Sequence, residues 1–132
     1  MVTVVVDSSV LFALVAAGLE GEWAHTEVRG HDLAAPHLAP FETANILRRH
    51  EMAGLMTSSE AVQAHADLVD LPVDLVGYGA LVPRAWDLRA NLTSYDASYV
   101  ALAEALGVPL VTLDRRLARA PALGCDVRTP DS

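Results

Sequence analysis

Residues 93–117 read TSYDASYVALAEALGVPLVTLDRRL, and this stretch decides the fold. It opens with T-x-x-D, the start of a helix capping pattern. The i, i+3, i+4, i+7 spacing of one apolar helix face follows at Tyr99, Leu102, Ala103 and Leu106. Gly107 is expected to end this helix. The pattern therefore predicts a helix that carries Asp96 in its first turn.

A short apolar run follows the helix. Residues 110–113, Leu-Val-Thr-Leu, are too few for a helix and are typical of a strand buried on both faces, as in a parallel sheet. Asp114 comes directly after this strand. One carboxylate is thus expected at the start of a helix and another at the carboxyl end of a strand, the edge where open α/β sheets bind ligands.

The rest of the chain alternates between the same two patterns. The valine-rich residues 2–6 predict the central strand, with Asp7 at its exit. Further strands are expected at residues 32–36, 71–76 and 125–128, and helices at residues 10–17, 22–28, 41–53, 57–68, 78–88 and 115–120. This alternation predicts an α/β protein, a three-layer α/β/α sandwich with a central parallel sheet, formed by a single domain over residues 1–132.

Helical spacing also predicts which side chains pack inward. In the helix at 57–68, which begins with the capping-box pattern Thr-Ser-Ser-Glu, the inward set is Val62, Ala66 and Val69. In the helix at 78–88, the inward set is Leu81, Ala85 and Leu88.

Composition limits the classes of function. The formal charge is −8, with nine arginines and no lysine, which argues against a surface that coats polyanions. The first residues contain no basic leader pattern, and the apolar run at 10–19 is too short to span a bilayer. The single cysteine, Cys125, excludes an internal disulfide. We therefore expect a soluble cytoplasmic protein without a membrane partner.

Four acids recur where helices begin, namely Asp7, Glu42, Asp96 and Asp114. Taken singly, each has an ordinary explanation as a helix cap or as compensation of the helix dipole. In a parallel sheet, however, Asp7 and Asp114 converge at one edge, and the other two can reach the same crevice. Two carboxylates about 5 Å apart repel by roughly 3 kcal/mol at an effective dielectric of about 20. Four of them therefore need a cation or a shared proton.

A hard divalent cation answers that need. Oxygen ligands without paired histidines or cysteines are typical of Mg²⁺ or Mn²⁺ sites. Such an ion activates water for in-line attack on a phosphodiester. Ser9 and Thr112 are placed to hydrogen-bond ligands or water, or else are ordinary turn and strand residues. Arg115 and Arg116, next to Asp114, are predicted to contact substrate phosphate.

Four motifs together carry a family resemblance. They are Asp7-Ser8-Ser9 after the valine-rich strand, Pro40-x-Glu42-x-x-Asn45, Leu-Thr-Ser-Tyr-Asp-Ala at 92–97, and Thr-Leu-Asp-Arg-Arg-Leu at 112–117. In this order they resemble a PIN-domain ribonuclease, and more narrowly the VapC toxins of type II VapBC toxin–antitoxin modules. The likeness runs from residue 2 to about residue 127.

The resemblance implies a PIN-like fold and endonucleolytic cleavage of RNA that depends on Mg²⁺ or Mn²⁺. On that pattern Asp7, Glu42, Asp96 and Asp114 are the catalytic acids. The first, third and fourth of these acids are the metal ligands, and Ser9 and Thr112 are polar supports. The resemblance also implies a homodimer and inhibition by a cognate VapB-type antitoxin. Arg115 and Arg116 stand where some family members carry a further acid, so one metal or two remain alternatives.

Other phosphate-handling α/β classes lack their residues in this sequence. It has neither G-x-x-x-x-G-K-[ST] nor G-x-G-x-x-G, and no lysine for a receiver-type phosphoacceptor site. A haloacid-dehalogenase-like phosphatase would carry an aspartate where Ser9 stands. The remaining alternative is a non-catalytic module that keeps the PIN fold and binds a protein partner.

Overall fold

The computed structural model describes residues 2–130, and its centre is a parallel sheet in the order β3-β2-β1-β4-β5. The strands are β1 (Val2–Val6), β2 (His31–Pro36), β3 (Val73–Val76), β4 (Leu110–Val111) and β5 (Val127–Arg128). Every neighbouring pair is parallel. The predicted parallel sheet with residues 2–6 at its centre is confirmed. Residues 1, 131 and 132 of the predicted domain lie outside the described residues.

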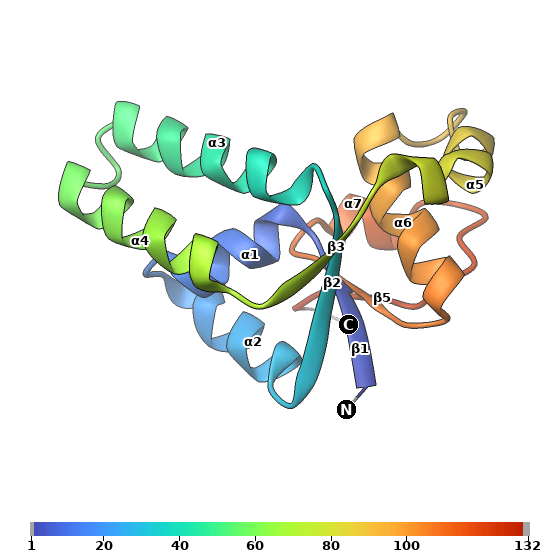
Figure 1. Cartoon of the computed structure of the whole chain (residues 1–132), viewed down its shortest axis with the longest axis horizontal. Helices are drawn as coiled ribbons and strands as arrows, with labels where there is room; N and C mark the ends of the chain where they lie inside the picture. Colours follow the sequence, from blue (N-terminus) through green and yellow to red (C-terminus); the bar gives the residue numbers. More distant parts are fainter. Residues whose placement is uncertain (1, 131–132) are drawn as a thin grey trace.

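Helices cover both faces of the sheet (Figure 1). The first layer holds α1 (Ser8–Val15), α2 (Leu19–Val28), α3 (Ala39–Met52) and α4 (Ser58–Asp70). On the other side lie α5 (Val82–Asp87) and α6 (Ser94–Leu106), and the short α7 (Arg115–Ala118) contacts β5. The predicted three-layer sandwich is therefore confirmed. Within residues 2–130, no helix is both long and apolar enough to span a bilayer.

The central strands explain why the sheet forms. Val4, Val5 and Val6 are at most 1% exposed, and both residues of β4 are fully buried. A parallel sheet with helices on both faces buries both sides of a strand, so its strands are continuous apolar runs. Each buried valine contributes about 1.5 kcal/mol or more to stability relative to an exposed one.

Helix α6 is buried more completely than a one-faced stripe predicts. All residues from Ala97 to Ala103 are buried, because one side of α6 packs against β1 and β2 and another side packs against α5. Leu106, predicted to be inward, is the last residue of α6 and is 48% exposed. Gly107 then ends α6 in the left-handed conformation (φ +66°), which glycine adopts without steric strain.

The predicted inward face of α4 is wrong. Val62 and Val69 are 67% and 69% exposed, and Ala66 is also exposed. The buried residues are Ala61, Ala64 and Leu68. Both sets have helical spacing, and the set with small alanines lets α4 approach α1 and α3 closely. The capping box of α4 between Thr57 and Glu60 is confirmed.

The helix predicted at 78–88 is divided. A 3-10 turn at Tyr78–Ala80 precedes α5, which begins just before Pro83. Proline has no backbone N–H to donate and is tolerated only in the first turn, so a new helix starts there. The predicted inward face, Leu81, Ala85 and Leu88, is buried as expected.

Candidate active site

Asp7 is a buried carboxylate at the junction of β1 and α1. Its Oδ1 caps α1 by accepting the Val10 N–H at 3.1 Å, and it also accepts the Ser9 hydroxyl at 2.5 Å. The Thr112 hydroxyl donates to its Oδ2. Burial, with a smaller contribution from the charge of Asp96, raises the pKa of Asp7 to about 6, against the lowering effect of these three hydrogen bonds. The side chain thus caps a helix and is a carboxyl group whose ionisation is opposed by burial.

Ser9 and Thr112 join two strand–helix junctions that lie far apart in the sequence. Besides donating to Asp7, Ser9 Oγ accepts the backbone N–H of Leu113 at 3.0 Å. Thr112 Oγ1 in turn accepts the backbone N–H of Asp114 at 2.9 Å. Each hydroxyl therefore links the Asp7 carboxylate to the turn after β4, and the predicted polar supports lie directly at this acid.

Asp96 lies in the first turn of α6. Thr93 caps this helix by accepting the backbone N–H of Asp96 at 3.2 Å. Partial burial and then the negative charge of Asp114 raise the pKa of the Asp96 carboxyl group, while Arg116 lowers it. The cap thus fixes the backbone, and the carboxylate faces another acid.

Asp114 is covered by an arginine two residues away. Its Oδ1 accepts the Arg116 backbone N–H at 2.9 Å and Nε at 3.3 Å, and its Oδ2 accepts Nη2 at 3.1 Å. Burial alone would raise the pKa of Asp114, but the hydrogen bonds and charge of Arg116 hold it below its usual range. Arg116, predicted to contact substrate phosphate, pairs in this structure with an acid of its own chain. Arg115 is exposed at the first position of α7.

Glu42 is connected to the other acids by Tyr99, a residue predicted to lie on the apolar face of its helix. The Tyr99 hydroxyl donates to Glu42 Oε1 at 2.7 Å. Burial raises the pKa of Tyr99 far above its usual value, and the hydrogen bond and charge of Glu42 and then the charge of Asp7 add to this rise. The phenol therefore stays a neutral donor. In the sequence, the hint of this polar contact was a hydroxyl group on an otherwise aliphatic helix face, three residues after Asp96.

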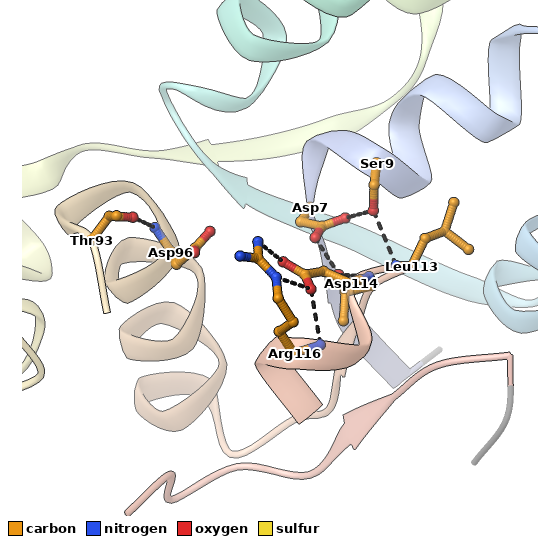
Figure 2. A network of polar contacts seen from close by, with 8 residues as sticks. Asp7, Ser9, Thr93, Asp96, Leu113, Asp114 and Arg116 are labelled. Carbon is orange, nitrogen blue, oxygen red and sulfur yellow. Dashed lines mark hydrogen bonds and ion pairs between the residues drawn. The ribbon is translucent and has the colours of Figure 1, made fainter. Parts of the chain in front are cut away.

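Three of the four predicted acids lie near one another at one end of the sheet, and Glu42 is connected to them through Tyr99. Asp7, Asp96 and Asp114 come from three different elements and lie around the Arg116 side chain (Figure 2). The charge of Asp96 acts on Asp7, and that of Asp114 acts on Asp96. A surface pocket of about 310 Å³ adjoins Asp96 and Asp114 and is lined also by Asn91, which sequence analysis did not identify.

The donor chemistry of this site fits a hard divalent cation. Burial and a neighbouring negative charge oppose ionisation of Asp7 and Asp96, and a cation would relieve both effects. In the described part of the chain, however, no three acidic, histidine or cysteine side chains converge as a ready metal-binding group. Arg116 engages both oxygens of Asp114. A cation at Asp114 would therefore have to displace this guanidinium group.

Comparison with known proteins identifies the family. Residues 4–123 match the family model described as the PIN domain. The chain belongs to the PIN-domain family. This PIN-domain protein is 39% identical to a VapC ribonuclease of Mycobacterium bovis over 127 residues, which cover 94% of the chain and 95% of the relative. The resemblance to VapC ribonucleases inferred from the four motifs is confirmed.

Solved structures support the same fold for this PIN-domain protein. The crystal structure of PAE2754 from Pyrobaculum aerophilum has a TM-score of 0.66 and 28% identity, covering 96% of this chain and 83% of that one. VapBC2 from Rickettsia felis, crystallised with a DNA fragment from their promoter, contains a chain with a TM-score of 0.62 and 12% identity. That alignment covers 96% of this chain and 98% of the other, and at this identity it concerns the fold alone.

Proposed function

We propose that this PIN-domain protein is the toxin of a type II toxin–antitoxin module and a Mg²⁺-dependent endoribonuclease that also accepts Mn²⁺. The observation that carries the proposal is that Asp7 and Asp114, at two strand exits, each lie close enough to Asp96 for the charges to interact. Similarity to a ribonuclease over nearly the whole chain supports the choice of RNA as substrate.

In this proposal Asp7, Asp96 and Asp114 hold the cation. When bound, the cation supplies positive charge that polarises a phosphoryl oxygen and makes a nearby water a stronger acid. Ser9 and Thr112 keep the Asp7 carboxylate in one orientation through their hydrogen bonds.

Glu42 and the arginines supply the remaining chemistry. In this proposal Glu42, whose Oε1 accepts the Tyr99 hydroxyl, is the carboxylate that accepts a proton from the attacking water. Arg115 and Arg116 are exposed beside Asp114 and contact the substrate phosphate. Arg116 must leave Asp114 to do so, which couples cation binding to substrate binding.

A protein partner is part of the proposal. A VapB-type antitoxin is expected because VapBC2 of Rickettsia felis, a neighbour in fold, is a complex of two components. A homodimer is expected from the family resemblance alone. Light scattering of the purified chain, alone and with a candidate VapB-type protein, tests both expectations.

Metal-dependent RNA cleavage is the decisive experiment. Wild-type protein, stripped of metal with EDTA, should cleave total RNA only after Mg²⁺ or Mn²⁺ is added. Asp96→Asn should abolish cleavage with an unchanged circular dichroism spectrum. Asp70→Asn, which removes an exposed acid at the end of α4, should cleave as wild type does. Full cleavage by a folded Asp96→Asn protein would refute the proposed role.

Thermal unfolding separates an enzyme from a binding module. A cation that binds the folded state and not the unfolded chain raises the melting temperature. Mg²⁺ should therefore stabilise the wild type, and Asp96→Asn should lose most of this gain. A non-catalytic module that keeps only the fold would show neither cleavage nor a Mg²⁺-dependent shift.

A further inference from the structure

Tyr99 is the link between Glu42 and the other acids of the site. Glu42 lies in the first turn of α3, and Tyr99 lies in the buried part of α6. The two residues are 57 positions apart, and the 2.7 Å hydrogen bond from the Tyr99 hydroxyl to Glu42 Oε1 joins the two helix layers. The ring is 2% exposed, so it cannot follow Glu42 if that side chain moves.

The position of Tyr99 on α6 matches this role. It follows Asp96 by three residues, and side chains at i and i+3 lie on the same side of a helix. The negative charges of both Glu42 and Asp7 lie close enough to the hydroxyl to raise its pKa. One helix therefore directs a carboxylate and a phenol toward the same group of acids.

We propose that Tyr99 is a positioning residue, whose hydroxyl holds the Glu42 carboxylate toward the Asp7 end of the site. This inference rests on the proposed function, because it assumes that Glu42 takes part in RNA cleavage. The alternative is that Tyr99 serves only to fill the core and that its hydrogen bond to Glu42 has no effect on catalysis. The two readings differ in what removal of the single oxygen atom does.

A double-mutant cycle distinguishes them. Tyr99→Phe keeps the ring and removes the hydroxyl, so kcat for RNA cleavage should fall roughly tenfold, while KM changes less than about twofold. Glu42→Gln should lower kcat by on the order of a hundredfold. In the Glu42→Gln background, Tyr99→Phe should cause no further loss, because the group that it positions is already gone.

Ser98→Ala is the matched control. It removes the hydroxyl of the preceding residue on α6, which is also buried but donates to the Ser94 carbonyl of its own helix at 2.8 Å. Its kcat should stay within about twofold of wild type. An equal loss in Ser98→Ala and Tyr99→Phe, or additive losses in the cycle, would show a general packing effect and overturn the inference.

A signature that needs no catalysis tests the same bond. A buried hydroxyl that donates to a carboxylate is shielded from water exchange, so wild-type protein without metal should show a downfield ¹H resonance. That resonance should be absent in Tyr99→Phe and shifted or lost in Glu42→Gln. If Tyr99→Phe does not fold, Glu42→Asp replaces it, because the shorter side chain withdraws the carboxylate from the hydroxyl. An unchanged resonance in Glu42→Asp would overturn the inference.

The outcomes also separate this inference from the proposed function. The absence of metal-dependent cleavage in the wild type would overturn both. Wild-type kcat in Glu42→Gln would overturn the role of Glu42, and with it the positioning role of Tyr99, but would leave the nuclease standing. Loss of cleavage in Glu42→Gln with wild-type kcat in Tyr99→Phe would overturn the positioning role alone and leave the nuclease standing.

Discussion

The Thr112 hydroxyl donates a hydrogen bond to the Asp7 carboxylate across 105 positions of sequence. The same hydroxyl accepts the backbone N–H of Asp114, and Ser9 makes the reciprocal bridge to Leu113. The ends of β1 and β4 are thereby tied together at the point where their two aspartates leave the sheet. Two small hydroxyl residues therefore determine how the buried anion is oriented.

Thr112→Val tests this bridge, because valine has the same shape and no hydroxyl. The variant leaves one Asp7 oxygen and the Asp114 N–H without this partner, so the free energy of unfolding should fall by about 1–3 kcal/mol. Urea unfolding measures this change, and RNA cleavage should fall with it. Thr43→Val is the control, since Thr43 is equally buried but its hydroxyl bonds the Ala39 carbonyl within α3. Equal cleavage by both variants would contradict the role of Thr112.

The buried Asp7 should make stability depend on pH when no metal is present. Its pKa rises on folding from 3.8 to about 6. Below pH 4 the folded and unfolded chains both hold the proton. Between about pH 4 and pH 6 the unfolded chain releases this proton while the folded chain keeps it. The free energy of unfolding therefore falls as pH rises, by up to roughly 3 kcal/mol. Above about pH 6 the contribution is constant.

Asp7→Asn isolates this contribution from those of other acids. In EDTA, the variant should gain stability relative to wild type as pH rises from 4 to 6, and the gain should level off above that range. Urea unfolding of both proteins at several pH values measures the difference. A difference that does not vary with pH would show that Asp7 is not the titrating group.

Arg116 should compete with a cation for Asp114. Removal of its guanidinium group frees both oxygens of that carboxylate, so Arg116→Gln should bind Mn²⁺ several-fold more tightly than wild type, as measured by electron paramagnetic resonance. Arg119→Gln makes the same change of charge at an exposed position three residues later and should alter Mn²⁺ affinity less.

RNA binding tests the second role proposed for the arginines. The double replacement of Arg115 and Arg116 by glutamine should weaken the affinity of the Asp96→Asn protein for RNA, and the loss should shrink at high salt because phosphate contacts are screened. Unchanged RNA affinity would remove both residues from the substrate site.

A separate ion pair should hold the segment that leads to β5. Glu104 on α6 accepts Arg84 Nε at 2.6 Å and the Gly124 N–H at 2.6 Å, and Arg84 Nη2 donates to the Ala122 carbonyl. Glu104→Gln should therefore cost about 1–2 kcal/mol of stability and speed hydrogen exchange at residues 122–128. RNA cleavage should change little. Glu22→Gln, an exposed acid on α2, serves as the charge control.

The same pair has its own pH dependence. The hydrogen bond from Arg84 holds the pKa of Glu104 below its usual value of 4.5. Because the folded pKa is lowered, the stabilisation is present above about pH 4.5 and is lost as pH falls below it. The protection factors for hydrogen exchange of the 122–128 segment, which correct for the pH dependence of intrinsic exchange, should therefore fall under acid conditions in wild type and less so in Glu104→Gln.

The sequence by itself determined the alternation of strands and helices and the positions of several helix caps. A valine-rich run that ends in an acid predicts a buried strand followed by a helix cap, and both Asp7 and Asp114 cap helices at strand exits as that pattern requires. The parallel sheet, its central first strand and the capping box of α4 followed from local chemistry in the same way. Local sequence suffices there because each residue's backbone preference depends on its near neighbours.

Only the tertiary structure decided which side chains meet. Helical spacing allowed two inward faces for α4, and packing against α1 and α3 selected the alanine face. The apolar stripe of α6 did not reveal that the Tyr99 hydroxyl reaches Glu42, and the motif around Asp114 did not reveal that Arg116 covers it. These contacts depend on how separate helices approach one another and how long side chains turn, and periodicity along one segment contains neither.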